Sequence, residues 1–518
     1  MKANPTRICV PVCVRHADEM PAAIKRAAEA ADMIELRLDC IEEAELDSLV
    51  RLLPEHLSRF GVPVILTLRS TDQGGSASAE CHARRRFWAS VEKLPEDWLI
   101  DLELDLAQKL AAEKPDNGLP TDWSCVICSH HDFAGVPANL EKIYERLAAT
   151  PARILKIAVQ SDDATDCLPI FRLLDRAQSE GRELIAIAMG QAGIATRILG
   201  PARGSYLTYG SLDDESATAP GQVTAKDLRD VYGIDEIDQQ TQVFGLMGRP
   251  IGHSISPQIQ NAAFRAADMN AVYVPFEVGD AGQFLLRMVR RDSREMNWNL
   301  RGLSVTAPHK AAVMRSLDWI EPAATEIGAV NTIVVQGNKL RGYNTDASGF
   351  VWPLRKKFGS LRDARCAIIG AGGGARAALW ALRNEGAQIE LFVRDLSRAE
   401  STAEQFGIDY HLLAKASFKG FDIVINATPL GTRGEQQDET PTVAEQLQSV
   451  RLAYDLVYNP LETRFLREAR AAGCETLSGI EMLIAQAAGQ FKLWAGEDAP
   501  VEVMRDAATR ALVSHGSS

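Results

Sequence analysis

The 518-residue sequence contains no long apolar run, no excess of positive charge and no low-complexity segment. No run approaches the ~18 consecutive apolar residues of a membrane-spanning helix, so no membrane partner is expected. The net charge is −13, with both signs spread along the chain, which disfavours nucleic acid as a partner and leaves small molecules. The N-terminal MKANPTR leads directly into a strand-like run, so neither a signal peptide nor a transit peptide is expected.

Cysteine is scarce: the sequence has nine, an odd number, scattered along the chain. This pattern is typical of a reduced, cytoplasmic protein and not of a disulfide framework. Cys125 and Cys128 form a C-x-x-C pair inside a strand-like run, where residues three apart point to opposite faces. A zinc site needs further ligands in turn geometry, so no bound metal is expected.

A glycine-rich stretch between an expected strand and an expected helix is the clearest motif. Its Gly-x-Gly-x-x-Ala spacing is typical of a dinucleotide-binding turn, because Gly370 allows the tight turn and Gly372 lets the backbone approach a pyrophosphate. Free N–H groups at the helix start then bind phosphate. A glycine-rich turn without a ligand is the alternative. The candidate cofactor-binding residues of this turn are Gly370, Gly372, Gly373, Gly374 and Ala375.

The first 233 residues alternate between short apolar runs and helix-like stretches. The expected strands are 8–14, 33–39, 62–70, 98–105, 124–132, 153–159, 184–190 and 205–211, and the main expected helices are 20–31, 42–53, 138–149 and 168–179. Alternation implies parallel pairing, and eight units predict a closed (β/α)₈ TIM barrel.

Charged residues interrupt these expected strands. Glu35 and Arg37 lie two residues apart, as do Asp101 and Glu103, so each pair shares one face of a strand, and Arg69 ends the third strand. Charges at the carboxyl ends of barrel strands usually belong to an active site. The alternative is a buried ion-pair network that only stabilises the barrel.

Lys156 and His131 are the candidate reactive residues of the barrel. Lys156 interrupts an apolar strand, and a desolvated lysine among apolar neighbours has a lowered pKa, so that its neutral amine can attack a carbonyl. His131, at the end of the fifth strand, can carry protons. Together with the carboxylates they predict imine chemistry on a polyhydroxylated keto compound.

Six motifs, at 34–39, 68–70, 100–104, 129–133, 155–158 and 216–222, resemble those of type I 3-dehydroquinate dehydratase over about residues 7–233. The resemblance implies dehydration of 3-dehydroquinate to 3-dehydroshikimate, with Lys156 forming an iminium at the C3 ketone. His131 would remove the C2 proton and then protonate the departing C1 hydroxyl. The implied substrate-binding residues are Glu35, Arg37, Arg69, Arg197 for the carboxylate, Thr218 and Gln222.

Two positions depart from that family's pattern. An acidic residue usually precedes the Gly-Gly pair after Arg69, whereas this chain has Gln73. The departure leaves open which group sets the pKa and the orientation of His131. Thr218 stands where the family has serine and keeps the hydroxyl.

Residues 234–242 are polar and aperiodic and are predicted to link domains 1–233 and 243–518. In the second half, Ser256 followed by Pro257 predicts an N-cap and first turn for a helix over 258–267. Two serines at a helix start suit a carboxylate, or alternatively only cap the helix. Lys310 follows an expected strand-to-helix turn, where it is either a lone surface lysine or a proton donor held by Asp346.

These features, with motifs at 426–431, 454–460 and 479–488, resemble shikimate dehydrogenase over about residues 243–518. The resemblance implies that Lys310 donates a proton while the nicotinamide delivers hydride, and that Asp346 orients Lys310. A substrate lobe (243–345 and 479–518) and a Rossmann-like dinucleotide lobe (346–478) are expected. The implied substrate-binding residues are Ser254, Ser256, Thr306, Asn331, Tyr458 and Gln486, and the motifs add Thr428 and Gly479 to the cofactor-binding set.

The cofactor choice depends on the end of the second dinucleotide-lobe strand. Arg394 and Arg398 resemble the family's NADP-binding arginines, whereas Asp395 is a departure that suits a 2′-phosphate less well. NADP is therefore predicted, with NAD as the alternative.

The product of the first half is the substrate of the second, so the fused chain resembles the bifunctional enzymes of aromatic amino acid biosynthesis. Two alternatives stay open: a ligand-sensing regulator that has lost the chemistry, and a catabolic NAD-dependent quinate or shikimate dehydrogenase. The candidate reactive residues Lys156, His131, Lys310 and Asp346 argue against the first, and Arg394 argues against the second.

Overall fold

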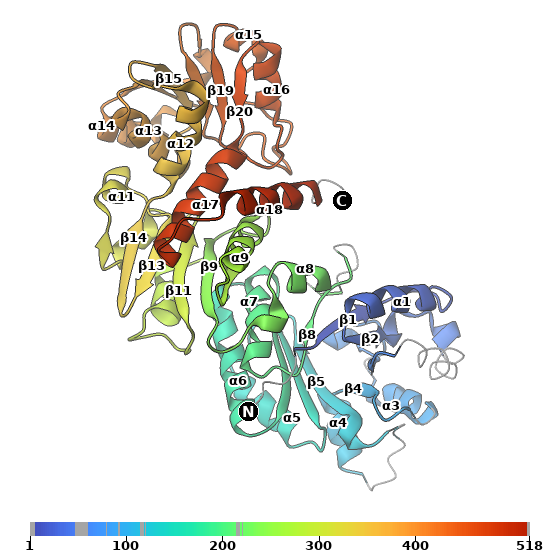
Figure 1. Ribbon diagram of the computed structural model, residues 1–518. Coiled ribbons are helices and arrows are strands. Elements are labelled where there is room, and N and C mark those ends of the chain that lie inside the picture. Colours follow the sequence, from blue (N-terminus) through green and yellow to red (C-terminus); the bar gives the residue numbers. More distant parts are fainter. Residues whose placement is uncertain are drawn as a thin grey trace. The chain divides into compact units, whose positions relative to one another are not determined.

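The computed structural model describes residues 6–46, 61–78, 80–91, 94–113, 119, 121–213, 218–219 and 221–514. Contacts between residues divide the chain into two compact units. The first comprises Met1–Thr241, Val274–Gly279 and Ser293–Asn299, and the second comprises Gln242–Tyr273, Asp280–Asp292 and Leu300–Ser518. Figure 1 shows the chain coloured along the sequence.

The first unit is a nearly closed barrel of eight parallel strands. They are β1 (Ile8–Val12), β2 (Met33–Arg37), β3 (Val64–Thr67), β4 (Leu99–Glu103), β5 (Val126–Asp132), β6 (Ile154–Gln160), β7 (Glu183–Met189) and β8 (Thr208–Tyr209). Their order is β7-β6-β5-β4-β3-β2-β1-β8. The Tyr206 N–H donates to the Leu184 carbonyl at 2.8 Å, which joins the segment before β8 to β7. The prediction of a TIM barrel is confirmed.

Helices follow most of these strands: α1 (Met20–Ala30), α3 (Cys81–Ser90), α4 (Leu104–Ala111), α5 (Leu140–Ala148), α6 (Cys167–Ser179), α7 (Ile194–Leu199) and α8 (Ala225–Asp230). In α5 the buried residues Leu140, Ile143, Tyr144 and Leu147 have helical spacing and form one apolar stripe. The predicted helix 42–53 lies largely outside the described residues.

Some predicted strand ends are wrong by a few residues. The strand expected over 98–105 ends at Glu103, because α4 begins at Leu104. The strand expected over 124–132 begins at Val126, because Asp122 accepts a hydrogen bond from the Ser124 N–H and starts a 3₁₀ turn. The last strand is only two residues long.

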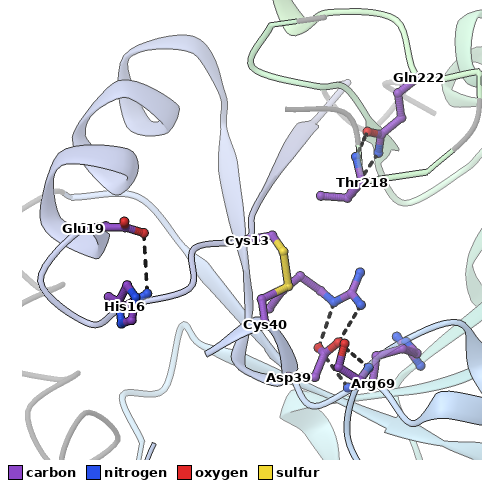
Figure 2. Close-up of a disulfide and its surroundings, with 10 residues drawn as sticks. Cys13, His16, Glu19, Asp39, Cys40, Arg69, Thr218 and Gln222 are labelled. Atoms are coloured by element: carbon purple, nitrogen blue, oxygen red, sulfur yellow. Dashed lines mark hydrogen bonds and ion pairs between the residues drawn. A yellow bond between two sulfur atoms is a disulfide. The ribbon is translucent and has the colours of Figure 1, made fainter. Parts of the chain in front are cut away.

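Cys13 and Cys40 form a disulfide that joins the chain just after β1 to the chain just after β2 (Figure 2). The expectation that all cysteines are reduced is therefore wrong for this pair. Cysteines 27 residues apart carry no sequence signal of proximity, and it is the parallel pairing of β1 with β2 that brings them together. The other seven cysteines are free.

Residues from Gln242 onward form two six-stranded sheets, and most of their residues belong to the second unit. The first, in the order β10-β9-β11-β13-β14-β12, is built from β9 (Gln242–Gly248), β10 (Ala271–Glu277), β11 (Leu300–Val305), β12 (Trp319–Ile320), β13 (Thr332–Gln336) and β14 (Lys339–Tyr343). Strand β13 runs antiparallel to both of its neighbours. Its helices are α9 (Ser256–Ala266), α10 (Ala281–Phe284) and α11 (Pro322–Ile327).

The second sheet is parallel, in the order β17-β16-β15-β18-β19-β20. Its strands are β15 (Arg365–Ile369), β16 (Gln388–Val393), β17 (Asp409–Leu412), β18 (Ile423–Asn426), β19 (Leu452–Asp455) and β20 (Glu475–Leu477). Its helices are α12 (Asp346–Phe358), α13 (Gly373–Asn384), α14 (Glu400–Phe406), α15 (Ala444–Leu447) and α16 (Arg464–Ala471). The strand order reverses between β15 and β18, as in doubly wound dinucleotide-binding folds, so the predicted Rossmann-like lobe is confirmed.

The C-terminal helices α17 (Gly479–Ala495) and α18 (Val501–Ser514) return to the first sheet of this unit (Figure 1). Helix α17 packs against both α12 and α9, and α18 packs against α9. Ile255, and not Ser256, is the N-cap of α9, because Ser256 already has helical geometry, so the predicted cap is wrong by one residue. No described helix is long and apolar enough to cross a membrane.

Candidate active sites

The amine of Lys156 lies inside the barrel among polar groups. Lys156, on β6, is 4% exposed, and its Nζ lies 3.1 Å from Glu35 Oε1, 3.0 Å from Asp101 Oδ2 and 2.9 Å from Tyr209 Oη. The sequence neighbours of Lys156 are apolar, but neighbouring strands place two carboxylates and a phenol around its amine.

Arg69 is held by an ion-pair network beside Lys156. Its guanidinium donates to Asp101 Oδ2 at 2.6 Å and to Ser129 Oγ at 2.8 Å, and it lies 3.5 Å from Glu103 Oε1. Burial alone would raise the pKa of Asp101, but Arg69 and then Lys156 lower it well below its usual value. Burial raises the pKa of Glu103, and the charge of Arg69 opposes this only in part. The buried network named as the alternative thus exists, but it surrounds the reactive amine.

His131, near the end of β5, has the properties of a proton acceptor. Burial, followed by the charges of Arg69 and Lys156, lowers the pKa of its imidazole well below 6.5, so the neutral ring predominates at neutral pH. Its Nδ1 is buried without a hydrogen-bond partner among the described residues. Gln73 Oε1 accepts from the backbone N–H of His131 at 2.7 Å, and therefore contacts the main chain of His131.

The remaining predicted dehydratase residues fall into three groups. Arg37 donates through Nε and Nη2 to both oxygens of buried Asp39, at 2.9 and 2.7 Å, and Asp39 also accepts the Arg69 backbone N–H (Figure 2). Arg197, on α7, donates to the Tyr209 carbonyl at 3.3 Å, and burial lowers its pKa to about 10, which leaves it charged at neutral pH. Thr218 and Gln222 are hydrogen-bonded to each other.

The second unit has a cavity of about 380 Å³. Nine of the predicted residues line it: Ser254, Ser256, Thr306, Lys310, Asn331, Asp346, Tyr458, Gly479 and Gln486. Hydroxyl and amide groups dominate this set, which suits a polar, hydroxylated ligand. Gly479 was expected at the cofactor and lines this cavity instead.

Lys310 forms an ion pair at the cavity wall. Its Nζ lies 2.6 Å from Asp346 Oδ2, and the other Asp346 oxygen accepts from Asn331 Nδ2 at 2.8 Å. Lys310 is therefore not a lone surface lysine. Because Asp346 is the first residue of α12 and Asn331 immediately precedes β13, two elements fix the direction of the Lys310 ammonium.

The serines and Tyr458 form another part of the wall. Ser254 Oγ lies 3.1 Å from Ser256 Oγ and accepts the Ser256 backbone N–H at 3.3 Å. Burial raises the pKa of Tyr458, although a hydrogen bond with Ser254 opposes the shift, so Tyr458 stays a neutral phenol. These hydroxyls can donate to a carboxylate.

A second cavity, of about 520 Å³, lies at the reversal of strand order in the parallel sheet. Gly370, Gly372, Arg394 and Thr428 line it, whereas Gly373 to Ala375 begin α13. Gly370 has φ +108, and a Cβ there would lie 2.9 Å from Thr428 Cγ2, whereas a Cβ on Gly372 would meet nothing within 4 Å. The glycines therefore leave an open cradle before a helix N-terminus, which fits a dinucleotide pyrophosphate.

Arg394 is exposed at the end of β16, where a ribose phosphate of a dinucleotide would be recognised. Asp395 caps the following 3₁₀ turn by accepting from the Ser397 N–H at 3.1 Å and from Ser397 Oγ at 2.7 Å. Its carboxylate is thus engaged within the turn. Arg398 ends the same turn.

Buried polar residues hold the loops of this cavity in place. Asn426 Nδ2 donates to Asp455 Oδ1 at 2.9 Å, and Asn426 Oδ1 accepts from the Thr428 backbone N–H at 3.0 Å. Burial raises the pKa of Asp455 to about 6. The motifs at 426–431 and 454–460 therefore position Thr428 and Tyr458 through the Asn426–Asp455 pair.

Comparisons with known proteins cover both halves of the chain. Family models match as type I 3-dehydroquinase over residues 8–239, shikimate dehydrogenase substrate binding domain over 246–333, shikimate / quinate 5-dehydrogenase over 354–456 and shikimate 5'-dehydrogenase C-terminal domain over 479–509. The chloroplastic bifunctional 3-dehydroquinate dehydratase/shikimate dehydrogenase of Arabidopsis thaliana is 33% identical, over 96% of this chain and 84% of that protein. The chain belongs to this bifunctional family.

Two further relatives match the second half only. A shikimate dehydrogenase (NADP(+)) of Methanopyrus kandleri is 40% identical over 53% of this chain and 98% of that protein. A crystal structure of a shikimate dehydrogenase in complex with NADP+ superposes with a TM-score of 0.50 and 36% identity, over 53% of this chain and 97% of that chain.

Several residues near the two sites were not predicted from the sequence. Arg84, on α3, pairs with Glu103 and with Asp105, but an arginine on a helix carries no signal of burial. Tyr209 lies in a predicted strand, where a tyrosine is an ordinary β-former. Ser304 and Gln490 line the dehydrogenase cavity and hydrogen-bond each other at 2.8 Å.

Proposed function

We propose that this chain catalyses two consecutive reactions of the shikimate pathway. The barrel dehydrates 3-dehydroquinate to 3-dehydroshikimate, and the second unit reduces 3-dehydroshikimate to shikimate with NADPH. The observation that carries the proposal is the buried Lys156 amine, 3.0–3.1 Å from two carboxylates, in a chain that also carries a Lys310–Asp346 pair beside a dinucleotide fold.

In the barrel, we propose a Schiff-base mechanism. The neutral Lys156 amine attacks the C3 carbonyl, and loss of water gives an iminium that acidifies the C2 proton. The neutral imidazole of His131 takes that proton, and the imidazolium then protonates the departing C1 hydroxyl. Arg197 binds the substrate carboxylate. The remaining substrate-binding residues that we propose are Glu35, Arg37, Arg69, Thr218 and Gln222.

In the second unit, we propose that Lys310 gives a proton to the C3 ketone oxygen while Asp346 orients the ammonium. When bound, NADPH supplies the hydride for that ketone. Tyr458, Ser254 and Ser256 bind the carboxylate, and the remaining wall of the site consists of Thr306, Asn331, Gln486 and Gly479. The cofactor cradle is formed by Gly370, Gly372, Gly373, Gly374, Ala375, Thr428, Arg394 and Arg398.

We also propose a cytoplasmic location and domain limits at 1–233, 234–242 and 243–518, with substrate-lobe and dinucleotide-lobe limits at 243–345 plus 479–518 and at 346–478. Seven free cysteines support a reducing compartment, although the Cys13–Cys40 pair speaks against it. Cell fractionation with thiol labelling tests the location. Limited proteolysis tests the limits, and cleavage outside 234–242 that separates two active fragments would contradict them.

A coupled assay tests the whole function: the full chain is mixed with 3-dehydroquinate and either NADPH or NADH, and nicotinamide absorbance is followed. We expect NADPH to be consumed. Lys156→Ala should block consumption from 3-dehydroquinate but not from 3-dehydroshikimate, and Lys310→Ala should block both. Absence of turnover from every substrate would favour the regulator, and a preference for NADH would favour the catabolic dehydrogenase.

A further inference from the structure

The phenol of Tyr209 lies against the reactive amine. Its Oη is 2.9 Å from Lys156 Nζ, and Nζ lies 4.6 Å from the centre of the tyrosine ring. Tyr209 ends β8, the short strand at the seam of the barrel, and is 5% exposed. A phenylalanine would fill the same volume without a polar group, so the buried hydroxyl is the distinguishing feature of this position.

The Tyr209 hydroxyl also reaches the carboxylate of Glu35. Oη lies 3.3 Å from Glu35 Oε1, which is itself 3.1 Å from Lys156 Nζ, so the three groups form a closed triangle of hydrogen bonds. A hydroxyl can accept from the amine and donate to the carboxylate at once. Burial, followed by the charge of Glu35, raises the pKa of Tyr209 well above 10, so the phenol keeps its proton at neutral pH.

Glu35 is the carboxylate that contacts both Lys156 and Tyr209. Asp101 also contacts Lys156, but Arg69 donates to the same Asp101 oxygen at 2.6 Å and holds the carboxylate ionised. Glu35 has no such arginine contact among its hydrogen bonds in the described chain. Its Oε1 accepts from the neutral hydroxyls of Thr67, at 2.8 Å, and Tyr209.

We propose that Tyr209 is a catalytic residue of the dehydratase that passes a proton from Glu35 to the carbinolamine oxygen during imine formation, and back during imine hydrolysis. The proposal rests on the Schiff-base function proposed above. The oxygen and nitrogen of a carbinolamine are bonded to the same carbon, so a hydroxyl in contact with the nitrogen also lies within reach of the oxygen.

Imine formation within this triangle consumes no proton from solvent. Lys156 gives a proton to Glu35, and the neutral amine attacks C3: the C–N bond forms, the carbonyl π electrons move to oxygen, and oxygen takes a proton from the attached nitrogen. The C–O bond then breaks as Tyr209 gives its proton to the oxygen, which leaves as water, and Glu35 returns a proton to Tyr209. The nitrogen lone pair forms the C=N bond. An iminium and a Glu35 carboxylate remain, so the net charge is unchanged.

The test uses Tyr209→Phe in the full chain, which keeps the ring and removes the hydroxyl. The measurement is incorporation of labelled oxygen from water into the ketone of 3-dehydroshikimate, which requires imine formation and hydrolysis but no dehydration. We expect this exchange to slow by about 100-fold, as for loss of a general acid, while borohydride still traps ligand on Lys156. Tyr206→Phe, a buried tyrosine outside this triangle, is the matched control and should exchange at the parental rate.

Different results would contradict the Tyr209 relay and the Schiff-base mechanism on which it rests. Parental oxygen exchange in Tyr209→Phe would overturn the relay. Parental exchange in Lys156→Ala, without a borohydride adduct, would overturn the Schiff base itself. Glu35→Gln removes the carboxylate that supplies the proton and leaves the Tyr209 ring in place. We expect oxygen exchange to be equally slow in this variant, which keeps the test available if Tyr209→Phe fails to fold. The dehydrogenase activity of each variant provides an internal measure of active chain.

Discussion

The side-chain oxygen of Gln73 accepts a hydrogen bond from the backbone N–H of His131 at 2.7 Å. Gln73 ends a 3₁₀ turn (Thr71–Gln73), and Gly74 follows with φ +81. This left-handed backbone favours glycine, and a Cβ there would also meet the exposed ring of Phe133, just after β5. The loop is thereby fixed to the main chain of His131.

Gln73→Glu should raise the pKa of His131. The carboxylate would keep the acceptor for the backbone N–H and add a negative charge beside an imidazole whose pKa is now well below 6.5. Since the neutral ring is the base, the parent should keep dehydratase activity as the pH falls below 6.5, and the variant should lose it at higher pH. NMR titration of His131 checks the direction, and the dehydrogenase pH profile should not move.

Gln73→Ala is the matched control for this substitution, because it removes the hydrogen bond without adding charge. If the pKa of His131 rises equally in both variants, the rise is caused by a change in the loop and not by the added carboxylate. An unchanged pKa of His131 in Gln73→Glu would mean that Gln73 does not influence the imidazole.

Arg394→Ala should raise the KM for NADPH by roughly 10- to 100-fold, the effect of losing a charge-assisted hydrogen bond to phosphate. The KM for NADH should change little, because NADH has no 2′-phosphate. Initial rates with both cofactors and saturating 3-dehydroshikimate check this, with exposed Arg362→Ala as the control. An equal rise in the KM for NADPH and for NADH would show that Arg394 does not recognise the 2′-phosphate.

Asp346→Asn should lower kcat for 3-dehydroshikimate reduction by about 100-fold or more, because the Lys310 ammonium would lose the carboxylate that orients it at 2.6 Å. The KM for NADPH should stay near the parental value. Steady-state kinetics of both half-reactions check this, with dehydration as the internal reference. A raised KM with unchanged kcat would indicate that Asp346 only binds substrate.

Cys13→Ser should destabilise the barrel by about 3–4 kcal/mol, the value expected for opening a loop of this length. The disulfide closes 27 residues between the ends of β1 and β2, next to Asp39, which accepts the backbone N–H of Arg69 at 3.1 Å (Figure 2). Heat inactivation of the dehydratase should therefore occur at lower temperature, in the variant and in the reduced parent. Cys81→Ser, at a free cysteine, should not change it.

The barrel could be predicted from the sequence because the alternation of strand-like and helix-like stretches, and the charged residues within the expected strands, are local features of the chain. Glu35 and Lys156 interrupt apolar strands, Arg69 follows one, and parallel pairing places such positions at one end of a barrel. The contacts among them follow from register, which is a long-range property. Tyr209 is 53 residues from Lys156 in sequence, so its role required knowing which strands meet at the seam.

Other differences had local causes that the sequence did not reveal. Ile255 is the N-cap of α9 because the helix already begins at Ser256, one residue earlier than the Ser256-Pro257 pair suggests. Gly479 matched a motif assigned to the cofactor, but the start of α17 lies at the substrate cavity.

Within the described part of the chain, Nδ1 of His131 has no hydrogen-bond partner, and this has a thermodynamic consequence. Gln73 fixes the main chain at this residue but leaves the imidazole torsions unrestrained by hydrogen bonds at Nδ1. A ligand that engages the ring must therefore order it, at an entropic cost of about 0.5–1.5 kcal/mol for one immobilised side chain. Calorimetry should find binding of a product analogue with a hydroxyl near the imidazole to be more enthalpic, and entropically less favourable, than binding of its deoxy counterpart.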